Sequence, residues 1–326
     1  MMPAPERKAM PQTRIFYATD IHGSEICFTK FLRAGEFYKA QVLIVGGDIT
    51  GKMVIPVIEQ HDGGYSIDFM GTTRVANGDA ELLSLEKSIT DAGFYPYRTT
   101  FSGYQELKAD QAKVDSLFSR LMVESVRRWL AMAEESLSRT DVKCFITPGN
   151  DDRLDIDSLF ENGERVINPE GKLVKLDEHH EMISTGYANM TPWNCPRDIS
   201  EEELAKRLDS MAAQVEDMSN CVFNFHCPPF DSGLDSAPKL DEELRVSVKD
   251  GGLSMVPVGS VSVRSAIVKY QPLLGLHGHI HESRGTYKIG RTLCVNPGSE
   301  YSEGILRGMI LNIEKDRVKG YLPTSG

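Results

Sequence analysis

The 326-residue sequence has no hydrophobic run long enough to cross a membrane, so we expect no membrane partner. Lys and Arg number 36 and are outnumbered by 47 Asp and Glu, which gives a formal net charge of -11. A long nucleic-acid footprint needs clustered cations that displace counterions, and this balance disfavours nucleic acid as a partner. Small anions stay compatible with the chain, because bound metal ions can supply local positive charge.

Paired cysteines are also missing. The six cysteines include no C-x-x-C pair and several lie in apolar runs, so we expect reduced, buried thiols and a cytoplasmic location. Residues 1–13 are polar and contain proline but no apolar segment, which predicts a flexible N-terminal tail and not a signal peptide.

Short apolar runs alternate with helical patterns along residues 14–326, which predicts one α/β domain. The near-continuous hydrophobicity of the runs indicates strands that are buried on both faces. Ser200 and Glu203 predict a capping box, and Ser260 is expected to cap a later helix. Residues 308–322 predict a terminal antiparallel pair. The other expected strands are residues 15–18, 42–45, 143–147, 181–186, 221–225, 273–276 and 292–295.

Residues 52–140 interrupt this alternation and predict an insertion. The sequence Asp-Gly-Gly at residues 62–64, between two β-like runs, predicts a hairpin. The apolar spacing over residues 114–132 predicts one long amphipathic helix. Two interpretations stay open, because the insertion could overhang a functional site or could decorate the surface.

Side chains able to bind metals directly follow several expected strands. The first strand leads to Asp20 and His22, an oxygen and a nitrogen ligand that could converge on one ion. The second leads through two glycines to Asp48, a carboxylate placed to bridge two cations. Each pattern alone is a weak signal, since short patterns occur by chance and Asp48 could simply cap the next turn.

The third and fourth strands lead to Asn150 and His226. The neutral carbonyl oxygen of Asn150 suits a hard or borderline cation without adding charge, although an Asx-turn is the structural alternative. His226 precedes a Pro-Pro turn, and a single histidine at such a place is more often a core or turn residue than a ligand.

The fifth pattern, residues 277–281, holds three of the eight histidines. Histidines that alternate along an extended strand point the same way, so at least two could bind a metal. All five patterns supply hard or borderline ligands, and sites in open α/β sheets form at the carboxyl ends of strands. Because agreement of five patterns in order is improbable by chance, together they predict a metal site.

The ordered patterns resemble the signature of the calcineurin-like metallophosphoesterases, which is D-x-H, G-D, G-N-[HD], H and G-H-x-H. The resemblance spans about residues 14–300, and the G-N-D-D and G-H-I-H-E-S blocks are similar to Icc-like bacterial and archaeal phosphoesterases. It implies a four-layer α/β/β/α sandwich of two mixed β-sheets. It also implies a hydrolase that acts on a small phosphoester.

The resemblance further implies two divalent metal ions, and a ligand set without thiolates leaves Mn, Fe, Zn and Mg open. The ligands would divide three and three about one bridging carboxylate. In that division the first ion takes Asp20, His22 and His281, the second takes Asn150, His226 and His279, and Asp48 is the bridge. A metal-bridging hydroxide would then attack phosphorus in line.

One position departs from the family pattern. Many members have a histidine that is thought to protonate the leaving group where this chain has Asp151. An Asp is a poor general acid unless its pKa is raised, which repulsion from the neighbouring Asp152 would do. His277, by its proximity in sequence, and His61, delivered by the insertion, are the alternative acids. A third possibility is a substrate with a good leaving group, or slow turnover, so we expect phosphodiesters or activated esters to be favoured over alkyl monoesters. The candidate catalytic residues are Asn150, Asp151 and His277.

Three other functions stay open. A non-catalytic scaffold on the same fold would have lost ligands, whereas this chain keeps all seven. A nuclease would add basic clamping regions, and Arg127 and Arg128 are expected only on a solvated helix face. A cyclic-nucleotide phosphodiesterase would need a base pocket, for which insertion aromatics such as Tyr65 and Phe94 are candidates, although core packing explains them more simply. A homo-oligomer is also compatible with the sequence.

Overall fold

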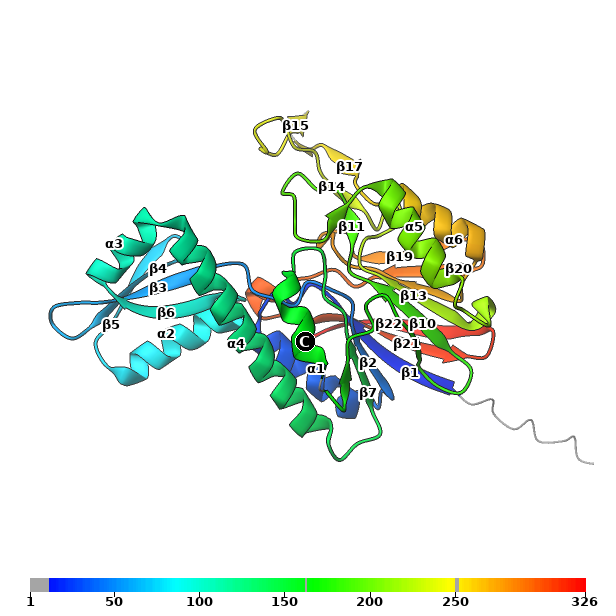
Figure 1. Ribbon diagram of the computed structural model, residues 1–326, viewed down its shortest axis with the longest axis horizontal. Helices are drawn as coiled ribbons and strands as arrows, with labels where there is room; N and C mark the ends of the chain where they lie inside the picture. The colour runs from blue at the N-terminus through cyan, green and yellow to red at the C-terminus, as the bar shows by residue number, and fades with distance from the viewer. Residues whose placement is uncertain (1–11, 162, 250–251) are drawn as a thin grey trace, which may run out of the picture.

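Two six-stranded β-sheets form the centre of the protein, as the computed structural model in Figure 1 shows. The structure describes residues 12–161, 163–249 and 252–326. In spatial order, the strands of the first sheet are β22 (Arg317–Ser325), β21 (Arg307–Glu314), β1 (Gln12–Ala18), β2 (Val42–Val45), β7 (Lys143–Ile146) and β8 (Val166–Ile167). Strands β1, β2, β7 and β8 run parallel, whereas β21 and β22 form the expected terminal antiparallel pair.

The second sheet is also mixed. In spatial order, its strands are β19 (Gly285–Ile289), β20 (Thr292–Asn296), β18 (Leu274–Leu276), β13 (Cys221–Phe225), β10 (Glu181–Thr185) and β9 (Leu173–Lys175). The four inner strands are parallel, and the edge strands β9 and β19 are antiparallel to their neighbours. The expected α/β class is therefore confirmed.

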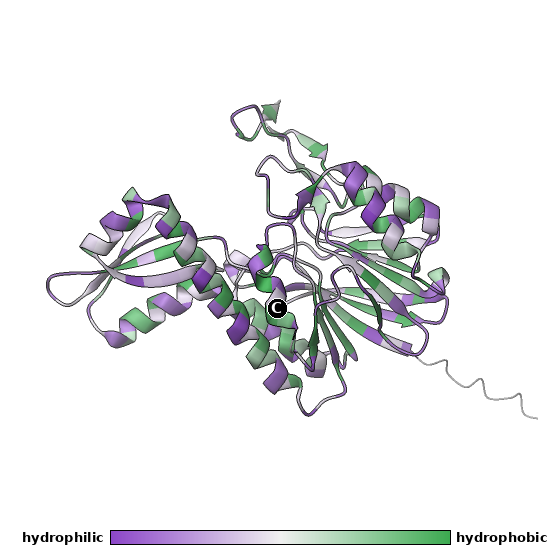
Figure 2. Cartoon of the chain, viewed as in Figure 1, coloured by the Kyte–Doolittle hydropathy of each residue, from purple (hydrophilic) through white to green (hydrophobic). Residues whose placement is uncertain are grey.

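Alternate residues of the inner strands enter different cores, which explains why these strands have no polar face. Phe16 and Leu43 pack in a cluster with helices α1 (Glu25–Phe37) and α4 (Gln111–Leu137). Tyr17 and Ile44, one residue further along each strand, belong to a cluster shared with the second sheet. The other face of that sheet packs against α5 (Glu201–Ala212) and α6 (Val261–Tyr270). Figure 2 shows the resulting apolar colouring of both central sheets.

Helix starts agree with the capping residues expected from the sequence. At the start of α5, the Ser200 and Glu203 side chains form the reciprocal capping box. At the start of α6, the Ser260 hydroxyl accepts hydrogen bonds from the backbone N–H groups of Ser262 and Val263. Each cap satisfies backbone donors that would otherwise have no partner at the helix terminus.

Residues 52–140 contain more structure than a hairpin and a helix. They form a separate four-stranded sheet, at the left of Figure 1, that packs with helices and has an apolar cluster of its own. In spatial order, its strands are β5 (Thr72–Ala76), β4 (Tyr65–Phe69), β3 (Val54–Glu59) and β6 (Tyr95–Thr100). Its helices are α2 (Asp79–Asp91), α3 (Phe101–Ala109) and α4. We did not expect β5, β6, α2 or α3.

Shorter elements complete the chain. The 3-10 helices are η1 (Leu154–Phe160), η2 (Met218–Asn220) and η3 (Tyr301–Glu303). The two-stranded pairs are β11 (Ala188–Asn189) with β12 (Asp198–Ile199), β14 (Ser236–Pro238) with β17 (Met255–Pro257), and β15 (Val248–Lys249) with β16 (Gly252–Leu253). The pairs β14–β17 and β15–β16 project at the top of Figure 1.

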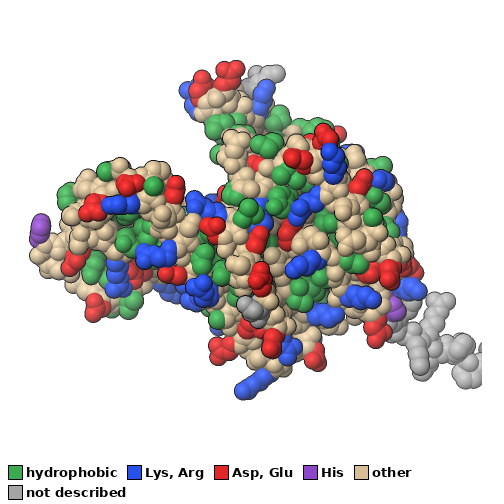
Figure 3. Space-filling model, in the orientation of Figure 1, with side chains coloured by type: hydrophobic (Ala, Val, Ile, Leu, Met, Phe, Trp, Pro, Cys, Tyr) green, Lys and Arg blue, Asp and Glu red, His purple; other side chains and the backbone are tan. Residues whose placement is uncertain are grey.

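The expected N-terminal tail, residues 1–13, lies outside the described residues as far as residue 11, and residues 12 and 13 already belong to β1. Within the described ranges, no helix has the length and apolar character needed to cross a membrane. Positive and negative side chains are interspersed over the face shown in Figure 3.

We expect replacement of Trp129 by Ala to destabilise the fold. The Trp129 ring is 3% exposed and stacks on Phe28 with ring centroids 4.2 Å apart. Removing a buried indole costs about 3–5 kcal/mol of unfolding free energy, because it leaves a cavity between α4 and α1. Urea denaturation followed by circular dichroism measures this loss. Replacement of the 65% exposed Trp193 by Ala is the control, and an equal effect of both changes would contradict the assigned core.

Candidate metal centre

The carboxyl ends of strands from both sheets meet at one place, and the predicted ligands lie there. They follow β1 (Asp20 and His22), β2 (Asp48), β7 (Asn150), β13 (His226) and β18 (His279 and His281). Backbone hydrogen bonds join the loops within each sheet, from Asp20 N–H to Gly47 O at 2.9 Å and from Gly278 N–H to His226 O at 2.8 Å. His279 N–H donates to both Asp20 carboxylate oxygens, at 3.1 and 3.0 Å, and so connects the two sheets.

Four of these ligands have a backbone conformation that side chains rarely adopt. The φ angles of Asp20, His22, Asp48 and His279 are 53°, 38°, 49° and 68°. Each such residue costs about 1–3 kcal/mol and persists only where the surrounding structure enforces it. The tight turns aim the ligands inward, and residues 277–281 are consequently not the extended segment that we expected.

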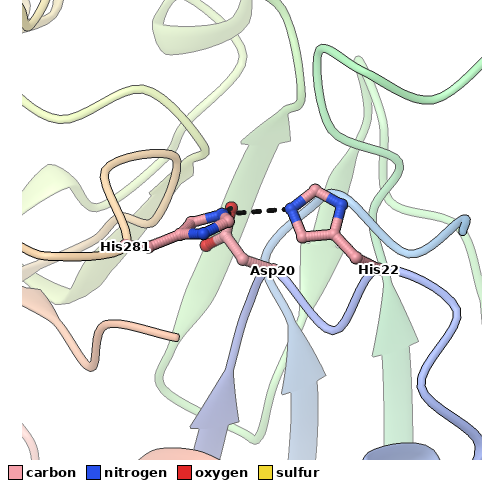
Figure 4. Close-up of side chains that lie close together, drawn as sticks. All are labelled: Asp20, His22 and His281. Atoms are coloured by element: carbon pink, nitrogen blue, oxygen red, sulfur yellow. Dashed lines mark hydrogen bonds and ion pairs between the residues drawn. The ribbon is translucent and has the colours of Figure 1, made fainter. Parts of the chain in front are cut away.

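Asp20, His22 and His281 form the first group of potential ligands (Figure 4). One ligand atom from each lies within 4.8 Å of the others. The Nε2 atoms of His22 and His281 are 3.0 Å apart, and Asp20 Oδ1 is 3.5 Å from His281 Nε2. The Tyr301 ring packs over this group, with its centroid 4.7 Å from that of His22.

Asp48, His226 and His279 form the second group, again with ligand atoms within 4.8 Å of one another. Asp48 Oδ2 is 3.5 Å from His226 Nε2 and 3.6 Å from His22 Nε2, so this carboxylate lies between the two groups. Asn150 adjoins the second group, since its Oδ1 is 2.9 Å from His279 Nδ1.

Hydrogen bonds orient these side chains from outside the groups. His226 Nδ1 is 3.0 Å from Gly46 O and donates to it, which leaves Nε2 facing the carboxylates. The Asn150 Nδ2 group donates to Asp198 Oδ1 at 2.9 Å, which turns its Oδ1 toward His279. The sequence held no signal for Asp198, which lies 48 residues further along the chain.

The site is a buried cluster of opposite charges. Asp20 and Asp48 are 0% and 4% exposed. Burial raises the pKa of both carboxyls, but the adjacent His226 opposes it, and the net pKa of each lies well below its usual range. Burial likewise lowers the pKa of His226, whereas Asp48 and Asp20 raise it, to about 9.

The donor set fits a divalent metal ion. Among the described residues, the buried His226 Nε2 and His22 Nδ1 have no hydrogen-bond partner. The Nε2 atoms of His22 and His281 face each other at a distance that requires a shared proton or a cation. Buried carboxylates without a nearby cation are costly, and imidazole with carboxylate and amide oxygens suits Mn, Fe, Zn or Mg.

Asp151 has a partner that we did not foresee from the sequence. Its carboxylate forms an ion pair with the Lys52 ammonium, and its backbone N–H donates to Asp48 Oδ1 at 3.0 Å. Asp151, His22 and Asp48 also form a third group of potential metal ligands within 4.8 Å. Burial opposes the charged form of Lys52, but Asp48 and Asp151 raise its pKa above the usual range.

Asp152 has a structural role. Its buried carboxylate accepts hydrogen bonds from the backbone N–H groups of Ile49, Thr50 and Gly149, at 3.0, 2.8 and 2.7 Å. Burial, with a smaller effect of Asp48, raises its pKa to about 6. Asp152 therefore joins the loops after β2 and β7, which present Asp48 and Asn150.

The two alternative acids lie elsewhere. Within the described ranges, no group of potential metal ligands contains His277 or His61. His277 is fully buried, its Nδ1 is 2.8 Å from Phe225 O, and burial lowers its pKa to about 4. His61 is exposed in the turn after β3, a six-residue strand that leads away from the site for about 20 Å.

No family model matches the chain. An uncharacterized protein of Methanocaldococcus jannaschii, MJ1162, is 31% identical over 152 residues, which cover 46% of this chain and 61% of that relative. The crystal structure of TT1561 from Thermus thermophilus aligns with a TM-score of 0.52 and 13% identity over 96% of this chain and 99% of its own, a likeness of fold alone. A structure described as a novel archaeal phosphodiesterase aligns over 96% of this chain and all of its own at 12% identity, but its TM-score of 0.38 supports no inference.

We expect Gly47→Ala to weaken metal binding without removing a ligand. A Cβ at this residue, whose φ is 134°, would lie 2.2 Å from His226 Nδ1 and would displace the ring. Displacing one ligand lowers metal affinity by about tenfold or more. Titration with Mn²⁺ measures the affinity, and Gly320→Ala is the control because its Cβ would meet nothing within 4 Å. Wild-type affinity in Gly47→Ala would contradict the assignment of His226 as a ligand.

Proposed function

We propose that this chain is a metal-dependent phosphoesterase that binds two divalent cations and hydrolyses a small phosphoester, with phosphodiesters favoured. The observation that supports this most strongly is the position of Asp48 between two groups of ligands, 3.6 Å from His22 and 3.5 Å from His226. Asn150, which adjoins the second group, completes a division of three ligands on each side. The ordered resemblance of the five sequence patterns to metallophosphoesterases agrees with this proposal.

Two divalent cations held by these residues would lower the pKa of bound water and would bind phosphate oxygens. The chain itself holds the ligand side chains in position. Asp48 lies between the groups, Gly46 O orients His226, and Asp198 turns the Asn150 carbonyl inward. Packing of helices on the outer faces of both sheets supports the further proposal that the fold is the four-layer α/β/β/α sandwich.

The surroundings of Asp151 support a preference among substrates. Asp151 is paired with Lys52, and no group of potential ligands among the described residues contains His277 or His61. Without a histidine to protonate the leaving group, the reaction depends on a leaving group that departs as an anion. Phosphodiesters with aryl groups and other activated esters meet that condition better than alkyl monoesters.

Asp48→Asn tests the site. We expect this change to lower metal content by at least one equivalent per chain and hydrolysis by about a hundredfold or more, because an amide cannot serve both groups as a carboxylate does. Elemental analysis and hydrolysis of bis(p-nitrophenyl) phosphate measure the two effects. Asp209→Asn, which changes an exposed carboxylate paired with Lys269 on the surface, is the control. Wild-type metal content and wild-type hydrolysis in Asp48→Asn would exclude the proposed site.

Leaving-group chemistry tests the substrate preference. With Mn²⁺ present, we expect the wild-type kcat/KM for bis(p-nitrophenyl) phosphate to exceed that for an alkyl phosphomonoester by about a hundredfold or more. Parallel assays at one pH and one metal concentration give the ratio. Faster hydrolysis of the alkyl monoester would show that an effective proton donor is present and would contradict the preference.

A further inference from the structure

We propose that Lys52 is a substrate-binding residue whose ammonium pairs with a non-bridging oxygen of the phosphoryl group, and that Asp151 is a positioning residue that holds this ammonium. The inference rests on the proposed function, since it concerns the same site. It adds a fixed positive charge from the chain itself to the charge that metal ions would supply.

The backbone of Lys52 is fixed beside the site. The loop after β2 contains both Asp48 and Lys52, and Lys52 N–H donates to Gly93 O at 3.2 Å. Gly93 packs tightly on the first ligand group, because a Cβ there would lie 2.2 Å from His22 O. The preceding Gly51 N–H donates to the Tyr95 hydroxyl at 2.7 Å. The insertion strand β6, which contains Tyr95, therefore helps to place this loop.

The Lys52 side chain lies at the open side of the site. Its side chain and that of Asp151 are each 34% exposed, and that of the ligand His281 is 30% exposed, whereas those of His22 and His226 are 1% and 0% exposed. Asp151, which pairs with the Lys52 ammonium, has a carboxylate oxygen within 4.8 Å of ligand atoms of His22 and Asp48. A phosphoryl group bound at these ligands therefore lies close to the Lys52 ammonium.

The Lys52 ammonium can exchange Asp151 for a substrate oxygen. Both side chains of the ion pair are partly exposed, so solvent screens their attraction. A phosphate oxygen offers the ammonium a charge-assisted hydrogen bond of the same kind. Asp151 keeps the flexible lysine near the ligands in the absence of substrate, since its own backbone N–H is bonded to Asp48. The ammonium can then turn toward substrate while the carboxylate stays in place.

Lys52→Met, Lys52→Arg and Asp151→Asn test the proposal in the Mn²⁺-loaded protein. We expect Lys52→Met to keep its metal, to lower kcat/KM for bis(p-nitrophenyl) phosphate about 10- to 100-fold, and to weaken binding of inorganic phosphate about tenfold. Lys52→Arg should restore most of the phosphate affinity, because it restores the charge. Lys206→Met, which breaks an exposed ion pair with Glu202 on α5, is the matched control and should change neither quantity.

Asp151 is tested by a double-mutant cycle. If Asp151 acts through Lys52, Asp151→Asn lowers kcat/KM in the wild-type background but has no further effect in Lys52→Met. Additive losses of kcat/KM would overturn the positioning role. Loss of metal from Asp151→Asn would also overturn it and would show that Asp151 is a metal ligand, as its place in a group with His22 and Asp48 allows.

Failure of this inference and failure of the proposed function have different signatures. Unchanged kcat/KM and phosphate affinity in Lys52→Met, or loss of its metal, would overturn the role of Lys52 while hydrolysis by the wild type still stands. A wild-type protein that binds metal and phosphate but hydrolyses no phosphoester would overturn the proposed function. In that case a tenfold loss of phosphate affinity in Lys52→Met would still support Lys52 as the anion-binding residue.

Discussion

The burial of two carboxylates, Asp20 and Asp48, where the two sheets meet is the constraint on which the site depends. Buried charge is costly unless it is paired, and the histidines around these carboxylates only partly compensate for it. Without a cation, the two carboxylates raise the pKa of His226 to about 9, and the facing Nε2 atoms of His22 and His281 need a proton or a cation between them. Divalent cations satisfy both requirements at once, which is why the cluster is best understood as a metal centre.

The two sheets hold the loops that bring the buried carboxylates and the histidines together. Their inner strands are apolar on both faces and stack into three cores, so their carboxyl ends are held in fixed positions. The turns beyond those ends adopt positive φ at Asp20, Asp48 and His279, and cross-sheet bonds such as His279 N–H to Asp20 keep them there. The free energy of strand packing thereby stabilises loops that would be strained on their own.

Much of this arrangement follows from local sequence. The apolar runs predicted the strands of both sheets except the edge strands β8, β9 and β19. The patterns that follow these runs predicted the candidate ligands, and side-chain caps predicted the starts of α5 and α6. These features depend on residues that are neighbours in the chain. Contacts between distant residues were not predictable. The clearest cases are the hydrogen bond from Asn150 to Asp198 and the ion pair between Lys52 and Asp151. The insertion sheet was largely missed because only its hairpin and α4 have strong local patterns.

The difference between local sequence and distant contacts also explains why we expected His277 to act in the site. Proximity in sequence to His279 and His281 suggested a shared role, but the left-handed backbone at His279 separates them. The His277 ring instead stays in the buried interior of the second sheet, with Nδ1 on Phe225 O. The charged group nearest to Asp151 comes from the loop after β2, which no pattern near the histidines could indicate.

A crystal structure of the Mn²⁺-loaded protein, with anomalous diffraction measured at the metal edge, tests the metal centre most directly. We expect two anomalous peaks on either side of the Asp48 carboxylate. The first should contact Asp20, His22 and His281, and the second should contact Asn150, His226 and His279. A single peak that does not touch Asp48, or no peak after loading, would contradict the two-cation site.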